Sequence, residues 1–212
     1  MTPKDIHKLV LEGGSDHLGV FGGERRGGVN LQQIPDEITP CLYYLHIATG
    51  GKIKNYLEIG AASGGLTHLV NEIFSPEMII LVDNNEHTKS KWRKGILKDV
   101  KREEIIGDSQ SDKIIQAVKN YCILFDLVVI DADHRYMGVH NDINNYKHVC
   151  RDFLMLHDTI ACKGVKKAFE EFKEDYSFEF MEEFKSESHL NPLGIGLFRR
   201  RMWNFPPKKK TE

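Results

Sequence analysis

Short apolar runs alternate with amphipathic stretches along most of this 212-residue chain. The apolar runs contain few polar positions, which is typical of strands buried on both faces of a parallel sheet. We expect strands over residues 55–59, 78–82, 104–106, 125–130 and 153–156. Helices are expected between and after them, over residues 65–74, 86–97, 112–121, 138–149 and 163–173. This alternation predicts βαβ units and an α/β fold with a Rossmann-like, doubly wound sheet.

The pattern changes toward both ends of the chain. Residues 176–181 and 194–199 indicate two strands without an intervening helix, so we expect an antiparallel edge on a mostly parallel sheet. Pro35–Ala48 is expected to be a helix, with Pro35 in its first turn. Glu12–Asn30 holds too many glycines for a regular element, and both a loop that closes over a site and a disordered arm remain open. We therefore predict a helical and glycine-rich segment over 1–50, an α/β domain over 51–204 and a basic tail over 205–212.

Polar side chains stand at or just beyond the end of each predicted parallel strand. In chain order they are Glu58, Asp83, Asp108, Asp131 and the pair His157-Asp158. Ligands of open parallel sheets bind beyond the carboxyl ends of the strands. A single aspartate at such a position commonly caps the following helix. The repetition over five successive strands favours a binding crevice instead.

The first strand leads into the glycine-rich turn Leu57-Glu-Ile-Gly-Ala-Ala-Ser-Gly-Gly-Leu-Thr67. Glycines at positions 60, 64 and 65 allow a tight turn and a close approach of the backbone to a ligand. Dinucleotide-binding enzymes have a second glycine where this chain has Ala62, and Glu58 would repel a pyrophosphate. The turn therefore favours an adenosyl ligand without phosphates. Asp83 is placed to accept hydrogen bonds from a ribose, and Asp108 from an adenine amino group.

In combination, these segments resemble class I S-adenosylmethionine-dependent methyltransferases over residues 54–200. Leu57–Gly65 is similar to the first motif of that family, Val82-Asp83 to its ribose-binding acidic end, and Gly107-Asp-Ser109 to its adenine-side turn. The resemblance implies a seven-stranded sheet and S-adenosylmethionine as the cofactor. The cofactor-binding residues that it implies are Glu58, Gly60, Ala62, Ser63, Gly64, Asp83, Asn84, Asp108, Ser109 and Asp131.

A second pair of segments is similar to small-molecule O-methyltransferases, both the metal-dependent catechol and caffeoyl-CoA types and a cephalosporin hydroxylase-like bacterial group. These segments are Val129-Ile-Asp-Ala-Asp-His134 and Leu156-His-Asp-Thr159. By position they imply Asp131 and His134 as catalytic residues, with His134 taking the proton of the acceptor hydroxyl. They also imply Asp131, His157 and Asp158 as ligands of Mg²⁺ or another divalent cation.

The residues themselves give one reason for a metal and one against Mg²⁺. Crowding of Asp131, Asp133 and Asp158 would require a cation or protons to offset their repulsion. His157 stands where the family has a carboxylate, which favours a softer ion. The alternative, without any metal, is that His157 and Asp158 form hydrogen bonds with nearby backbone groups.

Composition narrows the expected partners. A formal net charge of −2 and one basic run, Lys208–Lys210, provide no field that would gather nucleic acid. The apolar runs are too short to cross a bilayer, and four scattered cysteines are typical of a reduced, cytoplasmic protein. We expect a small-molecule acceptor and leave a homo-oligomer open. Two alternatives to the methyltransferase remain: a dinucleotide-dependent oxidoreductase and a non-catalytic, cofactor-binding protein of the same fold.

Overall fold

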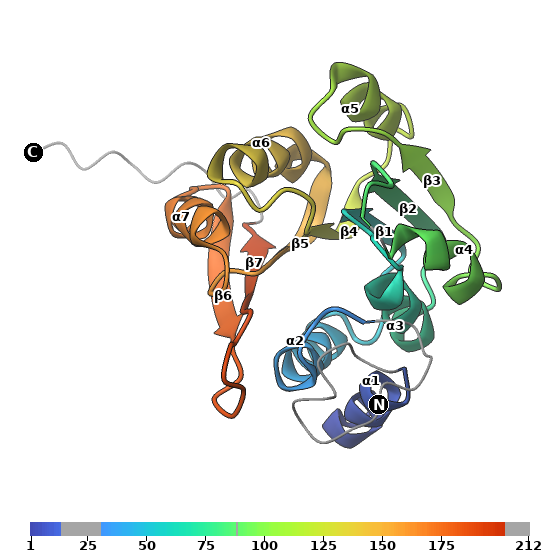
Figure 1. Ribbon diagram of the computed structural model, residues 1–212, viewed down its shortest axis with the longest axis vertical. Coiled ribbons are helices and arrows are strands. Elements are labelled where there is room, and N and C mark those ends of the chain that lie inside the picture. Colours follow the sequence, from blue (N-terminus) through green and yellow to red (C-terminus); the bar gives the residue numbers. More distant parts are fainter. Residues whose placement is uncertain (14–30, 88, 202–212) are drawn as a thin grey trace, which may run out of the picture.

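The computed structural model describes residues 1–13, 31–87 and 89–201, which contain one seven-stranded sheet (Figure 1). The strands are β1 (Asn55–Ile59), β2 (Met78–Asp83), β3 (Glu103–Ile106), β4 (Phe125–Ile130), β5 (Cys150–His157), β6 (Phe178–Phe184) and β7 (Ile195–Arg200). Their order across the sheet is β3-β2-β1-β4-β5-β7-β6. Strands β1 to β5 pair in parallel, whereas β7 is antiparallel to both β5 and β6. The predicted Rossmann-like sheet with an antiparallel edge is confirmed.

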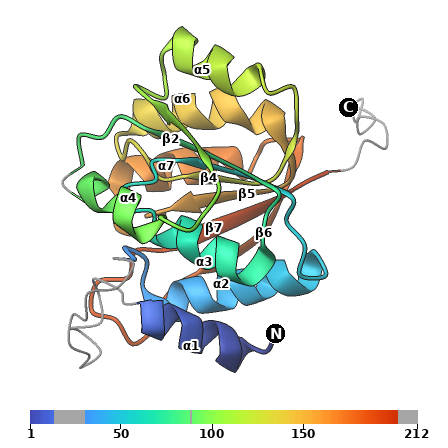
Figure 2. The same ribbon diagram turned by 90° about the vertical axis from the view of Figure 1, so that its right-hand side faces the viewer.

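Helices cover both faces of the sheet (Figure 2). One face carries α1 (Pro3–Gly13), α2 (Pro35–Ala48) and α3 (Gly65–Phe74), and the other carries α5 (Asp112–Lys119), α6 (Tyr136–Tyr146) and α7 (Lys163–Phe172). Neighbouring residues of a strand point to opposite faces. Tyr56 of β1 therefore belongs to the core cluster that contains Ile38 and Leu69, while Leu57 belongs to the cluster of Val139 and Phe169. Burial on both faces explains the nearly continuous apolar runs in the sequence.

The helix predicted over residues 86–97 is wrong. The structure has only a 3₁₀ turn, η2 (Ser90–Trp92), followed by the short helix α4 (Arg93–Ile96). Upstream, the side chain of Asp83 accepts a hydrogen bond from the Asn85 N–H at 2.6 Å, and the side chain of Asn84 accepts one from the Glu86 N–H at 3.0 Å. Side-chain bonds of this kind compete with helical backbone bonds, so the segment turns before it coils.

Two further helices, α6 and α5, differ slightly in their bounds from the prediction. The predicted helix over 138–149 begins two residues earlier, as α6, and finishes as a 3₁₀ turn, η3 (Lys147–Val149). The helix predicted over 112–121 ends at Lys119. These shifts leave the topology unchanged.

The order of strands reverses between β1 and β4, which are neighbours in the centre of the sheet. From β1 the chain proceeds outward through β2 and β3, and then it returns to β4 on the other side. Such a reversal opens a crevice at the carboxyl ends of the two strands. The loop after Ile59 and the loop after Ile130 therefore meet at this crevice.

Two sequence predictions fall outside the described residues. They concern the body of the glycine-rich segment, residues 14–30, and the basic tail over 205–212. Within the ranges that the structure describes, no helix has both the length and the apolar character needed to cross a membrane.

Candidate active site

The polar residues at the ends of β2, β3, β4 and β5 line one cavity of about 1400 Å³. Ten of the residues predicted from the sequence contribute to its lining: Gly60, Ala62, Asp83, Asn84, Asp108, Ser109, Asp131, His134, His157 and Asp158. They come from the ends of all five parallel strands and from the loops that follow. The topology thus brings together side chains that lie up to almost one hundred residues apart in the sequence.

Gly60 is the point of closest approach between the first and fourth strand ends. Its backbone has a φ of 92°, and a Cβ atom at this position would lie 2.3 Å from the Asp131 carbonyl oxygen. The Asp131 N–H donates a hydrogen bond to the Ile59 carbonyl at 2.8 Å. A side chain at position 60 would push these two loops apart, which explains the glycine.

Three other predicted cofactor residues, Glu58, Ser63 and Gly64, are absent from the described lining of the cavity. Glu58 is buried below the turn, where its carboxyl group accepts hydrogen bonds from the hydroxyls of Tyr56 and Thr67. Burial raises the pKa of Glu58 to about 8, because the carboxylate loses its hydration. The carboxyl group therefore ties the strand to helix α3, and its predicted contact with a cofactor stays a prediction.

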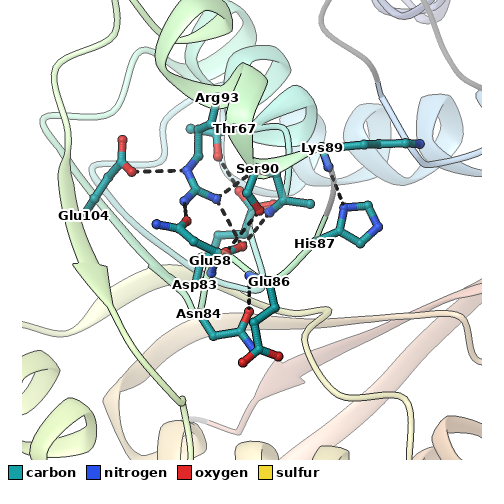
Figure 3. A network of polar contacts seen from close by, with 12 residues as sticks. Glu58, Thr67, Asp83, Asn84, Glu86, His87, Lys89, Ser90, Arg93 and Glu104 are labelled. Carbon is teal, nitrogen blue, oxygen red and sulfur yellow. Dashed lines mark hydrogen bonds and ion pairs between the residues drawn. The ribbon is translucent and has the colours of Figure 1, made fainter.

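Asp83 ends β2 at the centre of a polar network (Figure 3). One carboxylate oxygen, Oδ2, accepts from the Ala62 N–H at 2.8 Å and lies 3.1 Å from Nη1 of Arg93. The other, Oδ1, accepts from the Asn85 N–H at 2.6 Å and from the Ser90 hydroxyl at 3.3 Å. The carboxylate predicted to bind the ribose is thus engaged by the protein on both oxygens.

Arg93 of α4 connects the three loops that surround this network. Its guanidinium donates to the Ala62 carbonyl at 2.8 Å, to the Asn85 side chain, and to the Glu104 carboxylate at 3.1 Å. The glycine-rich turn, the end of β2 and strand β3 are therefore held by one buried side chain. Arg93 could not be identified from the sequence, because no local pattern shows where an arginine ten residues after a strand end directs its side chain.

The turn after β3 is held from α6. The Asp108 carboxylate accepts from the Gln110 N–H at 2.9 Å, which shapes the turn, and the Ser109 hydroxyl donates to Asp142 at 2.7 Å. The Tyr146 hydroxyl donates to the Ser109 carbonyl at 2.7 Å. Asp142 is fully buried, and burial raises its pKa to about 7. Asp142 and Tyr146 position the expected adenine-side turn, a role that the sequence did not reveal.

Two histidines and two aspartates form the other half of the site. Nε2 of His134 lies 3.4 Å from Oδ1 of Asp131 and 3.2 Å from Oδ2 of Asp158. Nδ1 of His157 lies 3.2 Å from Oδ1 of Asp131 and 3.6 Å from Oδ2 of Asp158. We refer to these four residues as the His–Asp cluster. Asp158 has a φ of 63°, a conformation uncommon outside glycine and frequent at functional sites.

The imidazoles and carboxylates of the His–Asp cluster shift one another's pKa values. Burial alone would raise the pKa of Asp131, but the two neighbouring imidazoles outweigh it and lower that pKa below its usual range. Burial alone would lower the pKa of His157, but Asp131 and Asp158 raise it well above its usual range. The hydrogen bond with Asp131 raises the pKa of His134 as well. Carboxylates and imidazoles therefore compensate one another in this half of the site.

The donor atoms of the His–Asp cluster are close enough to share a metal ion. Asp131, His157 and Asp158 each offer one ligand atom within 4.8 Å of the other two. A second set with the same spacing consists of His134, Asp158 and Cys162. Asp133 is in neither set, contrary to the expected crowding of three aspartates. Its carboxylate instead pairs with Arg135, whose Nη2 lies 2.7 Å away.

The segment before α2 also reaches the site. The side chain of Gln33, which is 3% exposed, donates to Oδ2 of Asp131 at 3.3 Å, and Gln32 lines the cavity. Leu193 lines it from the loop before β7. None of these three residues belongs to a recognisable motif, so they could not be identified from the sequence.

Comparisons with other proteins agree with this architecture. No known protein family and no curated protein matches the sequence. Among solved structures, an O-methyltransferase from Bacillus cereus in complex with SAH is 13% identical, with a TM-score of 0.66 over 93% of this chain and 91% of that chain. A putative caffeoyl-CoA O-methyltransferase from Staphylococcus aureus is 16% identical, with a TM-score of 0.62 over 79% and 85% of the two chains.

The same fold also serves other acceptors. A putative RNA methyltransferase from Pyrococcus horikoshii is 13% identical, with a TM-score of 0.64 over 95% of this chain and 100% of that chain. The chain therefore has the fold of class I S-adenosylmethionine-dependent methyltransferases. At such identities the similarity concerns the fold, and the activity must be argued from the site.

Proposed function

We propose that this protein transfers the methyl group of S-adenosylmethionine to a hydroxyl group of a small molecule. The observation that carries the proposal is the position of His134, within 3.4 Å of Asp131 and 3.2 Å of Asp158, in the same cavity as the glycine turn. Gly60 and Asp131 lie against each other, so a cofactor on the turn would present its methyl group beside this histidine.

The charge of the cavity supports a sulfonium ligand over a dinucleotide. The lining contains six carboxylate side chains, those of Asp83, Glu86, Asp108, Asp131, Asp133 and Asp158, against Lys89 and Arg135. Arg93 and the two histidines compensate part of this charge, and Glu86 and Asp108 lie outside those pairs. Negative charge in this arrangement attracts a cationic sulfonium group and repels a pyrophosphate. The absent second glycine, replaced by Ala62, argues in the same direction.

The proposed reaction is a direct displacement. The acceptor oxygen forms a bond to the methyl carbon while the carbon–sulfur bond breaks, which leaves S-adenosylhomocysteine and a methyl ether. The hydroxyl proton passes to the ring nitrogen of His134 that does not face the two carboxylates, and the imidazole must be neutral to accept it. Asp131 and Asp158 orient the imidazole and stabilise the imidazolium that forms. Because both reactants are held in line within one cavity, the reaction also avoids the entropic cost of bringing them together.

A divalent cation forms part of this proposal, with Asp131, His157 and Asp158 as its ligands. The spacing of their donor atoms, all within 4.8 Å of one another, fits a metal ion. An imidazole among the ligands suits a softer ion such as Zn²⁺ better than Mg²⁺. When bound, the cation would lower the pKa of the acceptor hydroxyl and orient its oxygen.

The proposal is tested by incubating the purified protein with S-adenosylmethionine and a panel of catechols, sugars and other polyols, with and without a chelator. We expect formation of S-adenosylhomocysteine that depends on one class of acceptor and is lost in a His134→Asn variant. Binding of the cofactor without turnover on any acceptor would favour the non-catalytic alternative. Binding of a nicotinamide dinucleotide in place of S-adenosylhomocysteine would favour the oxidoreductase.

A further inference from the structure

Cys162 precedes α7 directly, and two features of the backbone bring it against His134. The Cys162 N–H donates a hydrogen bond to the Asp158 carbonyl at 3.1 Å, which closes the turn between β5 and α7. Gly164 of α7 then packs on the loop after β4, because a Cβ atom at this position would lie 2.4 Å from the His134 carbonyl oxygen. A side chain at position 164 would therefore separate the start of α7 from His134.

The sulfur of Cys162 and the imidazole of His134 have the spacing of two ligands on one metal ion. Sγ lies 3.7 Å from Nδ1. In a tetrahedral site with metal–sulfur bonds of about 2.3 Å and metal–nitrogen bonds of about 2.0–2.1 Å, the two ligand atoms lie about 3.6 Å apart. Asp158 offers a carboxylate oxygen as the third ligand, and the three donor atoms all lie within 4.8 Å of one another.

The other ring nitrogen of His134 has the partner that a metal-binding histidine needs. Nε2 lies 3.4 Å from Oδ1 of Asp131, so that His134 can donate its Nε2–H to this carboxylate and offer the lone pair of Nδ1 to a cation. Metal-binding histidines almost always donate their second N–H to a carboxylate, a carbonyl or water, which fixes the orientation of the ring. Gln33 holds Asp131 from the other side, through a hydrogen bond of 3.3 Å to Oδ2.

We infer that His134, Asp158 and Cys162 form a binding site for a soft, thiophilic cation, and that this cation blocks methyl transfer when it is bound. Sulfur distinguishes this site from the set of Asp131, His157 and Asp158, because thiolate ligands select soft ions. The side chain of His134 is 45% exposed and Cys162 is partly exposed, so a cation can reach both from solvent.

The expected inhibition follows from the nitrogen that the cation occupies. Nε2 of His134 faces the two carboxylates, which leaves Nδ1 to take the proton of the acceptor hydroxyl. A cation on Nδ1 uses the same lone pair, so the histidine can no longer act as a base. Cys162 binds the cation as a thiolate, and its proton is released to solvent. The inhibition rests on the proposed function, whereas the binding of the cation does not.

The test is a titration of the reduced full chain with Cd²⁺, followed by the ultraviolet charge-transfer absorption of the cadmium–sulfur bond. We expect one tightly bound Cd²⁺ per chain in the unmodified protein, and loss of this step in Cys162→Ser. His134→Asn keeps the sulfur but lacks the imidazole, and it should bind Cd²⁺ at least about a hundredfold more weakly. Cys122→Ser is the matched control, because Cys122 is an exposed free cysteine outside the set, and it should titrate like the unmodified protein.

Unchanged binding of Cd²⁺ in Cys162→Ser or in His134→Asn overturns the site, whatever the activity of the protein. In the assay of methyl transfer, Cys162→Ser should need at least about tenfold more Cd²⁺ than the unmodified protein for the same fractional inhibition. Equal sensitivity of the two proteins overturns the inhibition while the site stands. Tight binding of Cd²⁺ at Cys162 without transfer to any acceptor contradicts the proposed function and the inhibition, and leaves the cation site intact.

Discussion

Nη1 of Arg93 lies 3.1 Å from Oδ2 of Asp83, and both side chains are almost completely buried. The pair sits between the glycine turn and the loop after β2, and the same guanidinium reaches Glu104 on β3. Removing one member of a buried ion pair destabilises a protein strongly, because the remaining charge stays buried without a partner.

Arg93→Met should lower the free energy of unfolding by about 3–5 kcal/mol, because Asp83 would remain buried without its counter-ion. Denaturant unfolding followed by circular dichroism measures this change. Lys94→Met, at the exposed neighbouring position of α4, is the control and should change the free energy by less than about 0.5 kcal/mol. Equal stability of the two variants would mean that the ion pair contributes nothing.

Glu58 makes the stability of the protein depend on pH in a defined direction. Its pKa rises from 4.5 to about 8 on burial, so the unfolded chain loses this proton before the folded protein does. The protonated Glu58 therefore adds its full contribution to the free energy of unfolding below about pH 4.5, and this contribution is lost as the pH rises toward about 8. In Glu58→Gln the free energy of unfolding should no longer fall with pH for this reason. At pH 8 it should exceed that of the unmodified protein by up to about 4 kcal/mol.

Unfolding curves of the unmodified protein and Glu58→Gln at pH 5, 6.5 and 8 provide the comparison. The difference between the two proteins should grow steadily with pH. A difference that stays constant would show that Glu58 is already ionised in the folded state, contrary to the effect of its burial.

Glu37 of α2 holds the loop between β6 and β7 by accepting three backbone hydrogen bonds. The donors are the N–H groups of Ser186 at 3.1 Å, Leu193 at 3.0 Å and Gly194 at 3.0 Å. Glu37→Ala leaves these donors without an acceptor and should cost about 3 kcal/mol or more in the free energy of unfolding.

The neighbouring Asp36→Ala is the control for this position. Asp36 is exposed and bonds only side-chain hydroxyls, of Ser186 and Ser188, in the described structure. We expect a cost below about 1 kcal/mol in the same unfolding experiment. Similar losses in both variants would contradict a special role for the buried carboxylate.

His134→Asn should reduce methyl transfer by about a hundredfold to ten-thousandfold, because the acceptor proton loses its base. Binding of S-adenosylhomocysteine should stay within about twofold, since His134 is assigned to the acceptor and not to the cofactor. His140→Asn, on α6 and outside the lining of the cavity, is the control. A parallel loss of transfer and binding in the His134 variant would contradict the separation of the two roles.

The sequence was most informative where the backbone alone determines the outcome. Continuous apolar runs on strands and polar residues at their ends are consequences of a parallel sheet, so Asp83, Asp108, Asp131 and His157 could be placed at one edge from their order. Gly60 could be recognised because a close approach of two loops excludes a side chain.

Partners across the fold were not accessible in the same way. Gln33 contacts Asp131 across 98 positions of sequence, and Asp142 meets Ser109 across 33. Such contacts depend on how helices pack, and no local pattern encodes them. Asp133 was expected to lie close to Asp131 and Asp158 because it is near Asp131 in the sequence. Its carboxylate instead pairs with Arg135, two residues later.

The most direct test of an S-adenosylmethionine site in this cavity is a calorimetric titration of the purified protein with S-adenosylhomocysteine, repeated with a divalent cation and with a chelator. We expect binding at about 100 μM or tighter, equivalent to roughly 5.5 kcal/mol. An effect of the cation on binding would support Asp131, His157 and Asp158 as its ligands. No binding under any of these conditions would contradict the assignment of this cavity to S-adenosylmethionine.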